Sequence, residues 1–149
     1  MRISIRIARY FVRISLAAAF LSAVADRFGM WGPPGSDGVV WGDIKSYENY
    51  VALLNSFAPI SFVSTMGWPA TIAEITIALG LLVGWQLRWF SLAAGILLTL
   101  FALAMCVALG PKPPLDYSVF SAASAAFLFF AIDDSDHQRR ETLTNKPDS

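Results

Sequence analysis

The chain has 149 residues, of which 56% are hydrophobic and only 15% are charged, and its mean hydropathy is +0.55. A soluble domain carries about 25% charged residues, so this composition predicts an integral membrane protein of one domain. The formal net charge is zero, which gives no reason to expect a nucleic-acid partner. The single cysteine, Cys106, excludes an intrachain disulfide, a CxxC redox pair and a cysteine-based zinc site.

Four apolar stretches follow one another along the chain. A helix needs about 20 apolar residues to cross a hydrocarbon core of ~30 Å. The third stretch, from Trp89 to Gly110, has no charged residue, whereas the fourth is short because Asp133 follows Ile132. We therefore predict an all-α membrane protein whose residues 1–132 form a four-transmembrane-helix bundle. The predicted spans are residues 9–29, 67–85, 88–110 and 116–132.

The first stretch has a second interpretation. Four arginines precede its apolar run, which ends in Ala23-Val24-Ala25, the A-x-A form of a signal-peptidase site. The first stretch is therefore either a retained span or a cleaved signal peptide, and both interpretations give the second span the same orientation.

The distribution of Lys and Arg predicts the orientation. With four spans, three basic residues lie on the outer side, namely Arg27, Lys45 and Lys112. The inner side then holds Arg2, Arg6, Arg9, Arg13, Arg88, Arg139, Arg140 and Lys146. Basic residues remain in the cytoplasm, so we expect both termini to be cytoplasmic.

The outer loop between spans one and two contains a predicted short amphipathic helix. Its apolar positions, among them Ile44, Tyr47 and Val51, follow a helical spacing, with Asp43 as the N-cap and Pro59 as the stop. After Ile132 the chain turns polar, and we expect residues 133–149 to form a disordered cytoplasmic tail. His137, in that tail, is interpreted as a solvated residue rather than a metal ligand, and we predict no metal site.

Glu74 is the only charge between Trp68 and Trp85. On a helical wheel the aliphatic residues gather on one side and Glu74 lies away from them. A carboxylate facing lipid costs roughly 2.5 to 3.5 kcal/mol, so we predict that Glu74 points into the bundle. Gly80 and Gly84 form a GxxxG pattern, which predicts a groove where another helix comes close.

Near the outer end of the bundle, other polar residues can join Glu74. The candidate ligand-binding residues are Glu74, Arg27 and Asp26, with Asp116 and Tyr117 at the rim, and none is assigned a catalytic role. One interpretation is a structural ion pair of Arg27 with Glu74 or Asp26. The other is a polar cavity, open to the outer surface, that binds a ligand headgroup or passes a proton. Asp116 has its own alternative, as the N-cap of the fourth span.

Three segments resemble the DoxX family of small bacterial integral membrane proteins. They are "RISLAAAFLSAVADRFG" in the first span, "TIAEITIALGLLVGWQLRWFSLAAGILL" across spans two and three, and "GPKPPLDYSVFSAASAAF" leading into span four. The resemblance covers nearly all of residues 9–132 and implies a four-helix membrane bundle with a retained first span. Arg27 and Glu74 are the positions that it implies as functional.

The resemblance also implies a role near redox chemistry of thiols, sulfur or oxidative stress. The chain lacks the cysteine pair of some redox-active relatives, so an accessory subunit is favoured over a stand-alone enzyme. Its partners would be the bilayer and a redox protein or further copies of the chain, with a quinone as the candidate cofactor. Two alternatives stay open, a proton-coupled carrier of a small solute and a non-catalytic membrane scaffold.

Overall fold

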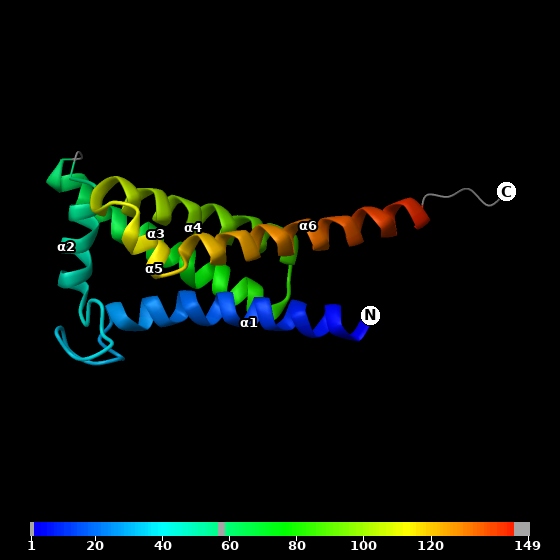
Figure 1. Ribbon diagram of the computed structural model, residues 1–149, viewed down its shortest axis with the longest axis horizontal. Helices are drawn as coiled ribbons and strands as arrows, with labels where there is room; N and C mark the ends of the chain where they lie inside the picture. Colours follow the sequence, from blue (N-terminus) through cyan, green and yellow to red (C-terminus); the bar gives the residue numbers. More distant parts are fainter. Residues whose placement is uncertain (1, 57–58, 145–149) are drawn as a thin grey trace.

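The computed structural model describes residues 2–56 and 59–144, and every regular element within them is a helix. The helices are α1 (Arg2–Arg27), α2 (Ile44–Leu54), α3 (Ile60–Val83), α4 (Leu87–Leu109), α5 (Lys112–Asp116) and α6 (Val119–Thr144). The all-α prediction is therefore confirmed. Four long helices, α1, α3, α4 and α6, run along one axis, and α2 lies across one end of them (Figure 1).

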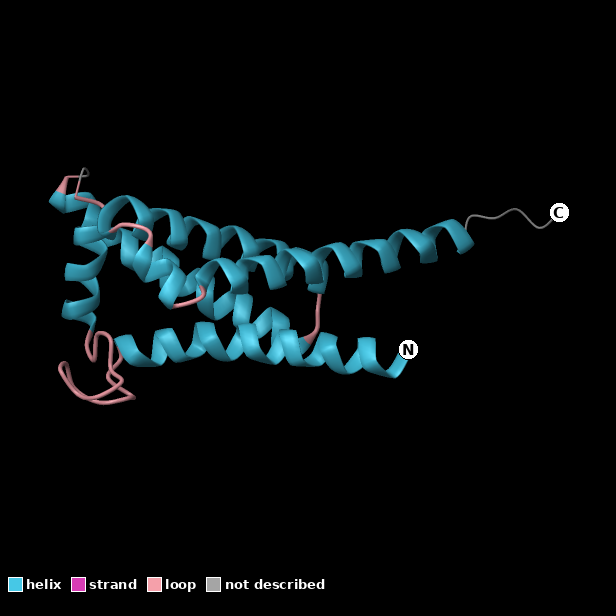
Figure 2. Ribbon diagram, in the orientation of Figure 1, coloured by secondary structure: helices cyan, strands magenta, loops and turns pink. Residues whose placement is uncertain are grey.

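The two ends of the bundle differ in their construction. At one end, which we call the cap end, α2 and the loop of residues 28–43 cover the long helices (Figure 2). At the opposite end, the terminal end, α1 begins and the C-terminal part of α6 projects beyond the other helices (Figure 1). α4 packs most extensively on α6, and α1 on α3.

Three helical segments within the described residues are long and apolar enough to cross a membrane: Ser4–Arg27, Thr65–Val83 and Leu87–Leu109. Their outward faces carry exposed side chains such as Phe11 (73% exposed), Val83 (77%) and Val107 (80%). Large apolar surfaces of this kind are unfavourable in water and favourable against lipid, so they indicate a membrane protein. α6 is apolar only as far as Ile132, and the fourth crossing stays a prediction.

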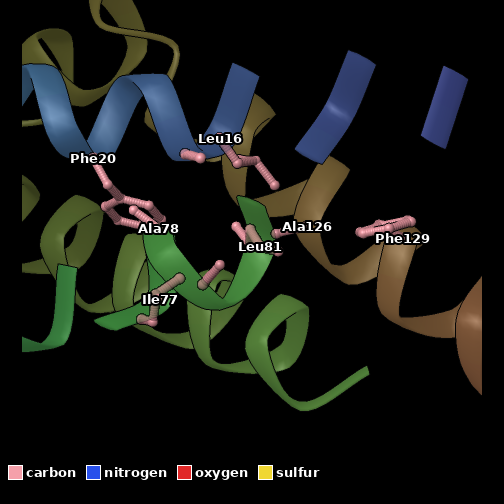
Figure 3. Packing of buried hydrophobic residues seen from close by; sticks show 9 residues of the cluster. Leu16, Phe20, Ile77, Ala78, Leu81, Ala126 and Phe129 are labelled. Carbon is pink, nitrogen blue, oxygen red and sulfur yellow. The ribbon is translucent and has the colours of Figure 1, made fainter. Parts of the chain in front are cut away.

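Small residues let the long helices approach closely. The core gathers Leu16 and Phe20 of α1, Leu81 of α3, Ala94 of α4 and Phe129 of α6, with alanines between them (Figure 3). Ala17, Ala78, Ala94 and Ala126 are each fully buried. Because lipid is as apolar as the core, close packing rather than the hydrophobic effect holds such helices together.

Gly80 of the GxxxG pattern is used within the chain. A Cβ atom at Gly80 would lie 2.4 Å from the ring of Phe90, so the ring of α4 rests directly on the α3 backbone. Gly84, with a φ of 82°, adopts the left-handed conformation that ends α3. The close approach predicted from the pattern thus occurs, and the helix that approaches is α4.

The structure confirms the short helix of the outer loop and its N-cap. Asp43 accepts a hydrogen bond from the Ser46 N–H, which lowers the pKa of its carboxyl, and Tyr47 and Val51 are buried. The predicted stop was wrong: α2 ends at Leu54, and Pro59 stands at the start of α3. Proline fits that place because the first turn of a helix leaves its N–H groups without intrahelical partners.

Two predictions about the last span are corrected. Asp116 does not cap the long helix, because it is the last residue of the short helix α5 and pairs with Lys112. α6 begins only at Val119 and then continues through the polar segment to Thr144, where the sequence predicted disorder. Ion pairs of Asp133 with Arg9 and of Asp134 with Arg88 hold the first polar turn.

Within that extension, the Gln138 side chain donates to Asp134 one turn earlier, as is typical of helix-stabilising pairs. The side chain of His137 and residues 145–149 lie outside the described part of the chain.

The contact of Gly80 with Phe90 predicts a specific destabilisation. Gly80→Leu should lower the free energy of unfolding in detergent by roughly 1 to 3 kcal/mol, because the added side chain must displace an aromatic ring. Adding Phe90→Ala should recover part of that loss. Ala19→Leu, on the exposed face of α1, is the matched control and should be neutral. If Gly80→Leu instead changes only the oligomeric state, the glycine faces another chain.

Candidate functional site

The cap is fastened to α1 by a single carboxylate. The side chain of Asp26 accepts hydrogen bonds from three consecutive backbone N–H groups, those of Val40 (2.9 Å), Trp41 (3.1 Å) and Gly42 (3.2 Å). Asp26 is only 5% exposed, so these bonds replace water that the carboxylate has lost. The end of the loop is therefore fixed immediately before α2 begins, and Asp26 is occupied by backbone rather than by Arg27.

Arg27 and Glu74 form a buried ion pair between α1 and α3. Arg27 Nη2 donates to Glu74 Oε1 at 2.8 Å, and Nη1 lies 2.5 Å from Oε2. Nη1 also donates to the Thr71 hydroxyl at 2.7 Å. The two residues are 2% and 1% exposed. The Nη2–Oε1 contact is a charge-assisted hydrogen bond, and the Nη1–Oε2 contact adds an ion-pair attraction without a second hydrogen bond.

Two aromatic rings of the cap cover the guanidinium. Arg27 Cζ lies 4.0 Å from the centroid of the Tyr47 ring and 5.2 Å from that of Trp41. Trp41 is held in turn by Tyr47 in an edge-on contact and by Tyr50. A desolvated cation against an aromatic face contributes about 2 kcal/mol, so the rings stabilise the charge as well as exclude water. Burial raises the pKa of the Tyr47 hydroxyl, which keeps that ring neutral near pH 7.

The start of α3 is shaped to receive the cap. A Cβ atom at Gly67 would lie 2.9 Å from the Tyr47 ring, so the absence of a side chain lets the ring approach. The Gly67 carbonyl accepts from the hydroxyl of Tyr47 at 3.3 Å and from that of Thr71 at 2.9 Å. Thr71 thus donates to the backbone and accepts from Arg27, which joins the cap, α3 and α1 in one network.

Two buried hydrogen-bond donors of this network lack an acceptor in the described part of the chain. Within the described residues, no acceptor lies in hydrogen-bonding range of Arg27 Nε or Trp41 Nε1. An unsatisfied buried donor costs about 1 to 3 kcal/mol, so the closed site is not fully satisfied by the protein alone.

Three of the five predicted site residues come together, and two do not. Asp26, Arg27 and Glu74 meet beneath the cap, and Glu74 points into the bundle as predicted. Asp116 is exposed and pairs with Lys112, and Tyr117 is 65% exposed. Neither contacts the Arg27–Glu74 pair in the interactions described here, although Tyr117 interacts electrostatically with Tyr50 of the cap. Ser118, with a φ of 55°, lies between α5 and α6.

The sequence did not reveal three further residues of the site, which are Trp41 and Tyr47 of the cap and Thr71 of α3. Tyr47 was expected to lie on the apolar face of the short helix, which it does, but nothing in its spacing indicates a cation beneath it. Thr71 lies three residues before Glu74, on the same side of α3, and that spacing is the one signal that could have identified it.

The described hollows lie beside this pair rather than around it. A small crevice of about 10 Å³ between α2 and α3 is lined by Tyr47, Gly67 and Thr71, among others, and is large enough for about one water. A larger groove of about 680 Å³ lies between α3 and α4 and is almost entirely apolar. Neither of these two hollows has Arg27 or Glu74 in its lining.

A second set of charges lies at the terminal end. Arg9 pairs with Asp133, and Arg88 Nε lies 2.9 Å from Asp134 Oδ1, which ties α1 and α4 to α6. Arg13 donates from Nε to the Leu81 carbonyl at 2.9 Å and from Nη2 to that of Leu82 at 3.2 Å. Arg13 therefore satisfies carbonyls that the end of α3 would otherwise leave without partners.

Comparisons of the chain with protein-family models, with curated proteins and with solved structures found no match.

The ion pair predicts strong coupling between its two partners. Arg27→Met or Glu74→Met alone should lower the free energy of unfolding by about 3 to 5 kcal/mol, because each leaves one uncompensated buried charge. The double variant should recover most of that loss, because two apolar side chains of similar volume can replace a buried pair. A mixed-detergent unfolding titration of all four proteins measures the coupling. Additive losses would show that the two charges act independently.

The carboxylate of Asp26 predicts a local loss of order in the cap. Asp26→Asn replaces one acceptor oxygen with a donor that faces backbone donors, which should cost about 1 to 3 kcal/mol. Hydrogen exchange of residues 39–44 should then become faster, while α4 keeps its protection. Asp37→Asn in the same loop is the matched control, because Asp37 is exposed. Equal exchange in both variants would contradict the role assigned to Asp26.

Proposed function

We propose that this chain is a DoxX-like integral protein of the bacterial cytoplasmic membrane, with four crossings and both termini in the cytoplasm. In this role it is a non-catalytic accessory subunit of a redox system that handles thiols, sulfur or oxidative stress. The cap lies on the outer side, and the charged terminal end lies in the cytoplasm.

The membrane placement is supported by three apolar helices and by the length of α6. Residues 119–132 contain no charge, and the pairs at Asp133 and Asp134 stand where the helix would leave the membrane. The excess of basic residues at the terminal end favours the cytoplasm for that end. The packing of Leu16 and Phe20 into the core favours retention of the first span rather than its cleavage.

The accessory role is supported by the closed Arg27–Glu74 pair. Each charge already faces its partner, and the cap rings cover the guanidinium, so both groups serve to hold α1, α3 and the cap in one arrangement. A carrier would need Glu74 to exchange protons with solvent, and a quinone head would need one of these groups as a partner. The proposal therefore assigns neither a transported proton nor a quinone to the pair.

The double variant R27M/E74M distinguishes a structural pair from a working site. In a host that lacks the native gene, this variant should restore growth under a thiol oxidant to the wild-type level. It should also copurify the same redox partner from mild detergent extracts. The physical reason is that the apolar pair preserves the packing while removing every titratable and charged function.

Accumulation in the membrane is measured in parallel, because it separates misfolding from loss of function. The single variants serve as controls and should accumulate poorly. A double variant that accumulates and keeps its cap, yet fails to restore growth, would show that the charges themselves carry the activity.

A further inference from the structure

The groove between α3 and α4 is an open, apolar channel on the membrane-facing side of the bundle. It holds about 680 Å³ and is lined by Pro69, Ala73 and Thr76 of α3 and by Trp89, Phe90 and Ala93 of α4, among others. The only hydroxyl named here, that of Thr76, donates to the Ile72 carbonyl of its own helix at 2.7 Å. The lining therefore has little to offer a polar ligand and suits a hydrocarbon chain.

The groove ends where α3 and α4 come together, on the side of the terminal end. The contact of Phe90 with Gly80 brings α3 and α4 together, and Trp85 packs beside Phe90 at 6.2 Å between ring centroids. The α3 wall of the groove runs from Pro69 to Ile77. These eight residues of separation give ~12 Å of helix rise, close to the ~15 Å of one membrane leaflet.

The cationic side chain of Arg88 lies at the end of the groove nearest the terminal end of the bundle. The Arg88 guanidinium lies over the ring of Trp89, with Cζ 4.8 Å from the centroid, and Trp89 forms part of the groove wall. The Arg88 side chain is 32% exposed, and its contact with Asp134 is made through Nε. A guanidinium has two further nitrogens, Nη1 and Nη2, whose N–H groups match the geometry of a phosphate, and the partial exposure of Arg88 allows a ligand to approach it.

Among the described side chains of the terminal end, arginines outnumber carboxylates. Arg9 and Arg88 pair with Asp133 and Asp134, whereas Arg13 binds the Leu81 and Leu82 carbonyls and lies over the Tyr10 ring. Arg13 therefore places a further positive charge at the end of α3. Basic residues at a membrane surface each contribute about 1 kcal/mol to the attraction of anionic lipid.

From these features we propose that the α3–α4 groove is a binding site for one anionic phospholipid of the leaflet at the terminal end. One acyl chain lies in the groove from Trp89 toward Pro69, and the phosphate accepts hydrogen bonds from Arg88. Under the proposed orientation this is the inner leaflet. The site is independent of the Arg27–Glu74 pair and rests only on the membrane placement of α3 and α4.

Native mass spectrometry of the delipidated full chain in mild detergent tests this proposal, with equal amounts of phosphatidylglycerol and phosphatidylcholine added. The wild type should retain one phospholipid and prefer phosphatidylglycerol. Thr76→Phe fills the groove and should reduce retention about tenfold, as expected if about two methylene groups lose their contacts. Ser15→Phe, an equivalent change on the exposed face of α1, should leave retention unchanged.

The headgroup contact is tested by two further variants. Arg88→Gln should reduce the preference for phosphatidylglycerol about fivefold, the equivalent of one basic contact. Asp134→Asn removes the competing carboxylate and should raise the preference, and a folding defect cannot produce that gain. Equal retention in Thr76→Phe and wild type, retention of an isoprenoid quinone in place of phospholipid, or a lipid-free dimer would each overturn the proposal.

Failure of the lipid site is distinguished from failure of the membrane placement by labelling. In a Cys106→Ser background, a membrane-impermeant maleimide should label Ser36→Cys only from outside and Ser135→Cys only from inside. Correct labelling without lipid retention contradicts the groove proposal alone. Labelling of both positions from one side contradicts the proposed four crossings.

Discussion

The Arg27–Glu74 pair is the interaction on which the cap end of the bundle depends, because each of its charges lies where water cannot neutralise it. A single buried charge in such a place costs several kcal/mol, and the pair removes that cost only while α1 and α3 keep their relative position. The rings of Tyr47 and Trp41 then close over the guanidinium, and Asp26 fixes the loop that carries Trp41. Two adjacent residues of α1 therefore have different main roles. Arg27 binds Glu74 of α3, and Asp26 binds the loop of the cap.

The rest of the bundle is stabilised by a different kind of contact. Away from the pair the helices meet through alanine and glycine, with single aromatic rings placed on glycine backbone, as Phe90 is on Gly80 and Phe127 on Gly95. Such contacts depend on shape, so they tolerate the apolar surroundings that make charges costly. Where α3 and α4 do not fit closely together, an apolar groove opens between them. The molecule thus has a closed polar end and an open apolar side, and the proposed accessory role and the proposed lipid site follow from these two regions.

The inward direction of Glu74 was predictable from the sequence because it follows from one helix alone. A carboxylate among aliphatic residues has one favourable direction, and the aliphatic positions identify the other side as the one that faces lipid. The partner was less certain, because Asp26 and Glu74 were equally plausible partners for Arg27. Only the position of the loop decides between them, since three backbone N–H groups occupy Asp26. The same limit applies to Asp116, whose place depends on a turn at Ser118 that its own sequence neighbourhood does not indicate.

Local sequence patterns were enough to predict the helical class, the three strongly apolar helices, the capped short helix after the first long one and the direction of Glu74. Each of these depends on the periodicity and composition of a single segment, so it can be predicted without knowing how the segments pack. The packing of the helices was needed to show that Tyr47 and Trp41 enclose Arg27, that Phe90 rests on Gly80, and that α6 continues into its polar segment. Each of these depends on atoms far apart in the sequence, such as Asp133 with Arg9, and no local pattern records which distant side chain will be near.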